Sequence, residues 1–402
     1  MTVENKAPEI RLQGFSRDWQ DKKIGSILAE TKRPVELLDN ELYQLVTVKR
    51  RNEGVVPRAI LKGKDILVKN YYGIKAGDYL ISKRQVVHGA NGIVPESLDN
   101  AVVSNEYLVV TDNDEITAKF WTVVSKRPEM HKLFFISSYG VDIEKLVFDV
   151  TDWKNRAITI PDVAEQKSIT DYFQQLDSLV IQHQKKHDKL KNIKKAMLDK
   201  MFPKQGKTIP EIRFKGFAGE WGECSIGDMT NCFSGGTPSV GVEAYYRGDI
   251  PFIRSAEINK TSTEINISEA GLENSSAKIV EVGTLLYALY GATSGEVGRS
   301  KVRGAINQAI LAIIPKAGIC SEFLSHWLRK SKNDILSRYL QGGQGNLSGD
   351  IVKNLIVQLP DFDEQRAIGI YFQKLDTLIN QHQQQITKLN NIKQACLRKM
   401  FV

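Results

Sequence analysis

The chain has 402 residues, which corresponds to two or three domains at roughly 150 residues per domain. Hydrophobic residues make up 42% and charged residues 25% of the sequence, as in ordinary globular proteins. This composition excludes wholesale disorder, a collagen-like fibre and a disulfide-rich miniprotein. Lysine and arginine number 55 against 47 acidic residues, and the net charge of +8 favours a polyanionic partner without identifying it.

The cysteines and the apolar runs bear on location. None of the four cysteines stands two to four residues from another, so the spacing of a zinc knuckle is absent. We expect reduced thiols in a cytoplasmic protein. The first residues carry no apolar segment of a signal peptide, and runs such as residues 309–315 are too short to span a bilayer. We therefore expect no membrane association.

The first predicted element is an entry segment that the chain contains twice. Residues 8–27 read PEIRLQGFSRDWQDKKIGSI, and residues 210–229 read PEIRFKGFAGEWGECSIGDM, with nine of 20 positions identical. Trp19 and Trp221 stand at matching places in the two copies. Because their surroundings are the same in both copies, we interpret them as core anchors and not as groups that stack on bases.

Each entry segment is followed by a variable region. Residues 28–158 and 230–358 share little obvious sequence, yet both contain short runs of branched and aromatic residues between turns, which is typical of strands. Examples are ELYQLVTV, GDYLISK and NAVVSNEYLVV in the first region, and GDIPFIR, GTLLYALYG and AINQAILAIIP in the second. A helical pattern covers residues 322–340. We predict a mixed α/β globule for each region.

A long helix follows each variable region and is the most similar repeat. Residues 160–202 and 359–401 match at 24 of 43 positions without a gap. Each copy begins with Pro-Asp-x-x-Glu, in which the aspartate can cap the helix while Glu165 or Glu364 reaches back to complete a capping box. A nuclease carboxylate cluster is a poorer interpretation, because its acidic residues would be spaced too closely. Repetition at an offset near 200 residues indicates a duplicated domain.

Apolar residues recur at three-and-four spacing along both helices. The two stripes are Ile169, Phe173, Leu176, Val180, Leu190, Ile193 and Met197 in one helix, and Ile368, Phe372, Leu375, Ile379, Ile386, Leu389, Ile392 and Cys396 in the other. A helix of about 57 Å needs a partner of matching length, and the other copy supplies one. His183 and His382 stand at matching stripe positions, where polar residues more commonly set register than bind a metal.

These observations predict the fold class. We expect an α+β protein with two mixed α/β globules joined by two long antiparallel helices in a coiled coil, with pseudo-twofold internal duplication. The predicted segments are residues 1–159 (first globule), 160–203 (central helix), 204–358 (second globule) and 359–402 (C-terminal helix).

Enzyme motifs were sought in the sequence. Gly206-Lys207-Thr208 resembles the end of a P-loop, but Met201 stands where the first glycine is required. The Asn-Pro-Pro-aromatic motif of amino-methyltransferases is absent, and Gly291, Gly295 and Gly298 do not form Gly-x-Gly-x-x-Gly. We predict no catalytic residue, no metal ligand and no cofactor site in this chain.

Basic and amide-bearing loops carry the binding hypothesis. Arginine and lysine can bind guanine in the major groove, and asparagine and glutamine can bind adenine. Each such residue taken alone is more often a solvated surface residue, but clustering favours the set. The candidate DNA-binding residues are Lys49, Arg50, Arg51, Lys83, Arg84, Gln85, His88, Asn91, Arg254, Ser255, Tyr290, Thr293, Ser294, Arg299, Lys301, Asn307, Gln308, Gln344 and Asn346.

Lysines of the central helix could serve the same partner. They are Lys185, Lys186, Lys189, Lys191, Lys194, Lys195 and Lys200. A charge run of this kind usually marks a solvated face, and it could also face a phosphate backbone.

Taken together, these motifs resemble the specificity subunit of Type I restriction-modification systems over essentially the whole chain. The resemblance rests on the PEIR-x-x-GF-x-x-x-W segments, the two P-D-x-x-EQ helices that end LxKMF, and the run of GGTPS (235–239) and GDIPFIR (248–254). The phrases GATSGEVG and AINQAILAIIP are similar to target-recognition domains of that family.

The resemblance implies a division of labour. Each target-recognition domain would bind one half of a split, asymmetric site in double-stranded DNA, and the helices would set the spacer and dock two modification subunits. S-adenosylmethionine and adenine-N6 methylation would come with those methyltransferase partners, and ATP and Mg with restriction subunits that translocate and cleave DNA. Two alternatives from other classes are a self-contained DNA methyltransferase or nuclease, which would need a catalytic motif, and a purely structural scaffold. The recognised bases cannot be derived from the sequence.

Overall fold

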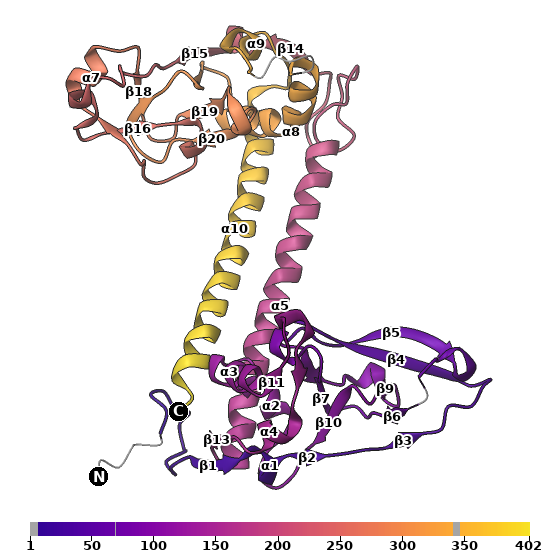
Figure 1. The fold of residues 1–402 in the computed structure, drawn as a ribbon. Coiled ribbons are helices and arrows are strands. Elements are labelled where there is room, and N and C mark those ends of the chain that lie inside the picture. The colour runs from indigo at the N-terminus through magenta and orange to yellow at the C-terminus, as the bar shows by residue number, and fades with distance from the viewer. Residues whose placement is uncertain (1–6, 69, 341–345) are drawn as a thin grey trace. The chain divides into compact units, whose positions relative to one another are not determined.

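The computed structural model describes residues 7–68, 70–340 and 346–402. It divides into two compact units: unit 1 comprises Met1–Gln184 together with Gln384–Val402, and unit 2 comprises Lys185–Gln383. These units cut through both long helices, whereas the segments predicted from the repeats place a boundary at the start of each helix. The strands and helices of each unit can be followed in Figure 1.

Unit 1 is built on a four-stranded and a five-stranded sheet. The orders are β2-β10-β7-β8 and β3-β6-β9-β4-β5, and β4 pairs with β9 in parallel. The strands of these two sheets are β2 (Ala29–Glu30), β10 (Tyr107–Thr111), β7 (Tyr79–Ser82), β8 (Asn91–Ile93), β3 (Pro34–Val35), β6 (Tyr71–Gly73), β9 (Val102–Ser104), β4 (Leu42–Lys49) and β5 (Gly54–Lys62).

Two short antiparallel pairs and five helices complete unit 1. The pairs are β1 (Gln20–Lys23) with β13 (Ala157–Ile160), and β11 (Ser138–Tyr139) with β12 (Val147–Phe148). The five helices that begin in unit 1 are α1 (Ile24–Ile27), α2 (Ala118–Val124), α3 (Pro128–Ile136), α4 (Val150–Lys154) and α5 (Val163–Lys200), of which α5 continues into unit 2. The last part of α10 (Phe362–Lys399) also lies in unit 1.

Unit 2 repeats this plan with unlike residues. Its sheets have the orders β15-β22-β19-β20 and β17-β16-β21-β18, and β16 pairs with β21 in parallel, as β4 does with β9. The strands are β15 (Thr230–Ser234), β22 (Ile310–Pro315), β19 (Leu285–Ala288), β20 (Val297–Arg299), β17 (Asn266–Ile267), β16 (Ile250–Ile253), β21 (Gly304–Ile306), β18 (Lys278–Val280) and the pair β14 (Gly222–Ser225) with β23 (Ile356–Leu359).

Five helices begin in unit 2, which also contains the last part of α5. They are α6 (Ile226–Met229), α7 (Glu269–Glu273), α8 (Ser321–Tyr339), α9 (Gly349–Lys353) and the first part of α10 (Phe362–Lys399). The strands predicted from the quoted runs, the helix at residues 322–340 and the two long helices are therefore confirmed. The matching topology of the two variable regions was not visible in their sequences.

An aromatic side chain at the end of each long helix closes the core of each unit. Phe202 packs against Trp221, Phe323 and Phe372 in unit 2, with ring centroids 5.2–6.1 Å apart. Phe401 makes the corresponding contacts in unit 1 with Trp19, Phe120 and Phe173, at 5.7–6.5 Å. Trp19 and Trp221 are 1% and 3% exposed, which confirms both as core anchors.

The two long helices run antiparallel within each unit. In unit 1, Asp177 of α5 pairs with Lys393 of α10, and in unit 2, Asp376 of α10 pairs with Lys194 of α5. The same contact thus occurs twice with the helices exchanged, as the duplication predicts. The apolar stripes are buried against more than the partner helix, because Ile169, Phe173 and Leu176 lie in the main core of unit 1.

The predicted capping boxes form only in part. The backbone N–H groups of Glu165 and Glu364 donate to the side chains of Asp162 and Asp361 at 2.9 and 2.8 Å, so the aspartates are caps. The carboxylate of Glu165 does not complete the box by accepting from the backbone N–H of Asp162. Both of its oxygens accept from Arg11, at 2.8 and 2.7 Å, because a buried guanidinium is a stronger partner than a backbone amide.

Unit 2 contains the same ion pair between its entry segment and its helix. Arg213 donates to the two oxygens of Glu364 at 2.7 and 2.6 Å, and the side chain of Glu364 is 1% exposed. The glutamine that follows in each helix is also buried, and its side chain satisfies backbone groups: Gln365 accepts from Cys320 N at 2.9 Å and donates to Pro360 O at 2.9 Å. The repeated Arg and Glu-Gln residues are therefore structural.

Removing one member of this buried ion pair should destabilise unit 2. Arg213→Met leaves the carboxylate of Glu364 buried without its partner, and we expect a loss of about 3–5 kcal/mol in the free energy of unfolding. The measurement is urea unfolding followed by circular dichroism. Arg247→Met is the control, because the ion pair of Arg247 with Glu243 is exposed and its loss should cost less than about 1 kcal/mol. Equal losses for the two variants would contradict this assignment.

Candidate nucleic-acid interface

In unit 1, the fold brings two separate basic segments together. The tip of the β4–β5 hairpin donates two backbone hydrogen bonds to the turn after β7: Arg51 N to His88 O at 2.7 Å and Asn52 N to Gly89 O at 2.8 Å. Arg51 and Asn52 have φ angles of 60° and 56°, and Gly89 has φ of 73°, so both partners adopt left-handed backbone at the junction. The candidates at residues 49–51 and 83–88 therefore share one surface region.

The basic side chains of this region are paired with glutamates. Arg50 contacts Glu144 at 2.6 Å and Arg84 contacts Glu106 at 2.8 Å, and all four side chains are about half exposed. The hydrogen bond to Glu106 raises the pKa of the Arg84 guanidinium. His88 lies 3.6 Å from the same Glu144.

The remaining candidates of unit 1 differ in exposure. Lys49 pairs with Glu53 at 3.9 Å, and Lys83 donates to Asn105 O at 2.7 Å. Gln85 is half-buried at the start of the turn. Asn91 is 2% exposed in β8, so the fold places it beneath this surface and apart from the exposed candidates.

In unit 2, three loops converge beside β19. Leu289 N donates to Ala309 O at 2.8 Å, and Leu347 N donates to Leu289 O at 3.0 Å. Tyr290 and Asn346 form an antiparallel bridge. The predicted residues Tyr290, Thr293, Ser294, Asn307, Gln308 and Asn346 are thereby brought together; Gln344 lies outside the described residues.

Some of these side chains serve the loops themselves. The Ser294 hydroxyl is buried and donates to Gly291 O at 2.8 Å, and Thr293 donates to Tyr290 O at 3.3 Å. Thr237, from the GGTPS run, donates to the side chain of Gln308 at 2.5 Å. Arg299 turns toward α8, where it contacts Glu322 at 3.3 Å, while Lys301 is exposed.

The loop clusters of the two units occupy matching connections. Phe148 N donates to Lys83 O at 2.9 Å in unit 1, as Leu347 N does to Leu289 O in unit 2. Gly295 has φ of 78°, close to that of Gly89, at the same distance after these residues. The turn after β7 thus corresponds to the turn after β19. Segments of unlike sequence therefore occupy the same part of one topology in the two units.

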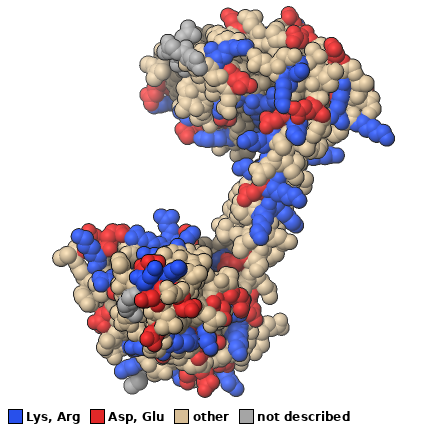
Figure 2. Space-filling view, turned by 90° about the vertical axis from the view of Figure 1, so that its right-hand side faces the viewer, with Lys and Arg blue, Asp and Glu red and all other residues tan. Residues whose placement is uncertain are grey.

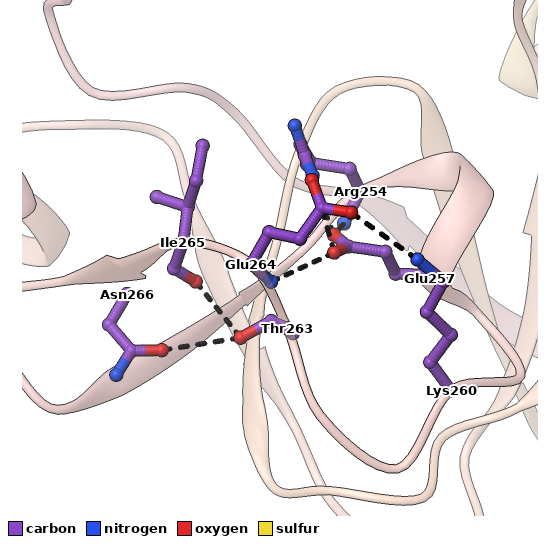
Figure 3. A network of polar contacts seen from close by, with 7 residues as sticks. All are labelled: Arg254, Glu257, Lys260, Thr263, Glu264, Ile265 and Asn266. Carbon is purple, nitrogen blue, oxygen red and sulfur yellow. Dashed lines mark hydrogen bonds and ion pairs between the residues drawn. The ribbon is translucent and has the colours of Figure 1, made fainter.

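Arg254 is held at the end of β16 by two carboxylates (Figure 3). Its guanidinium donates to Glu257 at 3.0 and 3.3 Å and to Glu264 at 2.5 Å. Glu257 is 2% exposed and also accepts the backbone N–H groups of Arg254 and Glu264, at 3.2 and 3.0 Å. The buried carboxylate therefore joins both ends of the segment 254–264. Ser255 is half-buried next to this network.

The electrostatics of Glu257 follow from these contacts. Burial by itself raises the pKa of the carboxyl, but the hydrogen bonds from Arg254 and from the two backbone amides outweigh burial and lower it below 4.5, the ordinary value. Arg254 lowers the pKa of Glu264 as well. Both carboxylates are thus ionised at neutral pH.

A cavity of about 530 Å³ lies beside Arg254. It combines aromatic surface with amide and charged groups. Its lining residues are Thr237, Val240, Tyr246, Phe252, Arg254, Glu264, Ile265, Asn266 and Asn307. Two of these, Arg254 and Asn307, are candidates from the sequence.

The structure adds residues that sequence reasoning missed. Glu106, Glu144, Glu257 and Glu264 each bind a predicted arginine. Only Glu257, three residues after Arg254 in a helix-like spacing, could have been found from the sequence, because the other pairs join different segments. In the view of Figure 2, lysine and arginine side chains lie next to acidic ones over both globules.

Metal-ligating side chains and the hydrophobicity of the helices can be assessed for the described part of the chain. Residues 7–68, 70–340 and 346–402 contain no group of three or more His, Cys, Asp and Glu side chains suited to a metal ion. His183 and His382 are half-buried in the long helices. Within the same ranges, no helix combines the length and hydrophobicity that a membrane span requires.

Two copies of one α+β plan, each with polar loops on matching connections, define a class of proteins with a duplicated binding domain. A family model described as the Type I restriction modification DNA specificity domain matches residues 16–192 and again residues 218–391. The chain belongs to this family.

Individual relatives agree with this assignment. The Type I restriction enzyme MjaIX specificity subunit of Methanocaldococcus jannaschii is 29% identical over 194 residues, which cover 46% of this chain and 44% of that protein. The EcoR124I/EcoR124II specificity subunit of Escherichia coli is 28% identical over 178 residues, 42% of this chain and 44% of that protein. The chain thus spans less than half the length of these two relatives. The HindI specificity subunit of Haemophilus influenzae is 22% identical, with coverage of 82% and 87%.

Solved structures share the fold. The Type I restriction-modification S subunit from M. genitalium has a TM-score of 0.60 at 16% identity, covering 98% of this chain and 99% of that one. A chain from a study of complex assembly and conformational transition of the type I R-M system has a TM-score of 0.52 at 17% identity, with coverage of 97% and 99%. The predicted α+β fold class and the family resemblance are confirmed.

The carboxylate of Glu257 should make the stability of unit 2 depend on pH. A group with a lowered folded-state pKa contributes stability that is present above its unfolded pKa and is lost as the pH falls through the folded value. Wild-type protein should therefore lose unfolding free energy below about pH 4.5 more steeply than Glu257→Gln, although the variant is less stable at neutral pH. Urea unfolding at several pH values measures both slopes, and parallel curves would contradict the assignment.

Proposed function

We propose that this chain recognises double-stranded DNA as a specificity subunit and does not catalyse a reaction by itself. The observation that carries the proposal is the matching placement of basic and amide side chains in two units whose variable regions are unlike in sequence. Matching placement is expected of two domains that bind the same kind of partner. Different side chains at these places are expected where the two domains bind different base sequences. Each unit therefore binds one half of a split, asymmetric site.

Contacts can be assigned by exposure. Lys49, Arg50, Arg51, Arg84, Arg254 and Lys301 are cations that reach the surface, and they suit guanine edges or phosphates. Tyr290, Asn307, Gln308 and Asn346 supply amide and hydroxyl groups for other base edges. Ser294 is buried and acts through the loop that its hydroxyl supports, and Asn91 is buried in β8.

The chemistry is assigned to partners. In this proposal, two modification subunits supply S-adenosylmethionine and adenine-N6 methylation, and restriction subunits supply ATP-driven translocation and cleavage with Mg. The names of the relatives, all specificity subunits of Type I restriction enzymes, support this division. Docking of the modification subunits on the long helices, a spacer set by these helices and a cytoplasmic location remain predictions.

The alternative of a self-contained DNA methyltransferase or nuclease leads to a direct test. The purified chain should bind duplex DNA but transfer no methyl group from S-adenosylmethionine and cut no strand. Addition of modification subunits should start adenine methylation, measured with a tritiated methyl donor. Methyl transfer by the chain alone would contradict the proposal.

Exchange of one variable region tests the independence of the two units. Replacing residues 230–358 with the region of another family member should change one half-site and leave the other intact, because the variable loops of each unit are held by contacts within that unit. Mapping methylated adenines in host DNA identifies both half-sites. Exchange of residues 28–158 is the matched control and should change the opposite half-site. If either exchange alters both, the units do not bind independently.

A further inference from the structure

Three of the four arginines proposed above to reach DNA, namely Arg50, Arg84 and Arg254, share an unexpected feature. Each one is occupied by the carboxylate of an exposed glutamate: Arg50 by Glu144 at 2.6 Å, Arg84 by Glu106 at 2.8 Å, and Arg254 by Glu264 at 2.5 Å. The glutamate side chains are 53%, 47% and 67% exposed. The pattern occurs in both units, although their variable regions are unlike in sequence.

Stability does not account for these three pairs. Ion pairs between exposed side chains contribute little to folding, because water screens them and both side chains lose conformational freedom. Glu257 provides the contrast within one network, since it is 2% exposed and holds backbone as well as side-chain donors. Glu264 contacts the same guanidinium with a side chain that is 67% exposed (Figure 3).

A carboxylate on arginine resembles the ligands that DNA offers. It presents two oxygens to the planar guanidinium, as a phosphate does and as the O6 and N7 atoms of guanine do. The pKa of Glu264 is lowered by Arg254, so this carboxylate is charged at neutral pH. The phosphates of DNA that approaches Arg254 must therefore displace the carboxylate of Glu264 or be repelled by it.

We propose that Glu106, Glu144 and Glu264 are specificity-determining residues that occupy the DNA-binding arginines until a correct base edge displaces them. This inference rests on the proposed function. Non-specific binding depends on cations that meet phosphates, and it is weakened when each cation already has an anionic partner. Cognate DNA compensates for the lost arginine–glutamate pair with additional hydrogen bonds to the bases. The glutamates therefore lower the affinity for non-specific DNA more than the affinity for the cognate site.

The experiment removes one carboxylate at a time from the full-length chain. Glu264→Gln and Glu144→Gln keep the shape of the side chain and remove its charge. Binding to a random-sequence duplex is measured by fluorescence anisotropy over a series of salt concentrations. We expect each variant to bind the random duplex several-fold more tightly. The slope of log affinity against log salt should steepen by up to about 0.9 for each arginine that is freed.

Two control variants separate this effect from a general change in net charge. Asp18→Asn and Glu220→Gln remove one exposed charge at matching positions of the two entry segments. They should leave the slope unchanged and raise affinity less than the test variants do. Thermal unfolding of every variant shows that the fold is retained, which is expected because the glutamates removed are exposed.

Specificity provides an independent measurement. In host cells that contain the modification subunits, Glu264→Gln should add methylated adenines at sites that depart from the original sequence in one half-site only. Glu144→Gln should relax the other half-site. The Asp18→Asn and Glu220→Gln controls should keep the wild-type methylation pattern.

The possible outcomes distinguish the inference from the function on which it rests. Test variants that behave like the controls, or that bind random DNA more weakly, overturn the inference and leave the proposed function intact. Weaker binding to cognate DNA alone also overturns it, because the glutamates would then accept from cytosine bases. A wild-type chain that binds no duplex, with or without modification subunits, overturns the proposed function and the inference together.

Discussion

The structure depends on aromatic contacts made by a phenylalanine two residues after the end of each long helix. Phe202 completes the core of unit 2, and Phe401 completes that of unit 1. Each ring is buried among three other rings, and truncation of such a side chain typically costs about 3–5 kcal/mol. Phe401 belongs to the second of the two segments that make up unit 1, residues 1–184 and 384–402, whereas unit 2 is one continuous segment. The duplication therefore yields two similar cores that differ in how the chain enters them.

The start of each long helix is held by a similar set of polar contacts in both units. The entry segment supplies Arg11 or Arg213, which binds the first glutamate of the helix, and the following glutamine bonds to backbone at the start of α2 or near α8. One short sequence on the helix thus holds both the entry segment and a point within the variable region, at Thr117 or Cys320. The residues between these points are free to differ, because they carry neither contact. This explains how unlike variable regions fold on one framework.

The sequence predicted the framework better than the site for a physical reason. Long helices, short strands and core tryptophans are encoded by periodicity and local composition, and the structure confirms them. The topology of the variable regions depends on non-local strand pairing, such as β4 with β9, which leaves no periodic mark. The glutamates that bind Arg50 and Arg84 are 94 and 22 residues away in sequence, so local patterns could not reveal them. Asn91 was predicted from its residue type alone, and the fold buries it.

Net charge is consequently a poor guide to how this surface meets DNA. The excess of eight positive charges suggested a polyanionic partner, yet Arg50, Arg84 and Arg254 of the candidate loops are each paired with a carboxylate within their own unit. A surface with unpaired arginines would bind any duplex, because phosphates are the same at every position. A surface whose arginines are paired binds tightly only where several base contacts replace the carboxylates at once. Discrimination then arises from the difference between two partners for the same guanidinium, and the identity of the neighbouring amide and hydroxyl groups decides which bases can make that exchange.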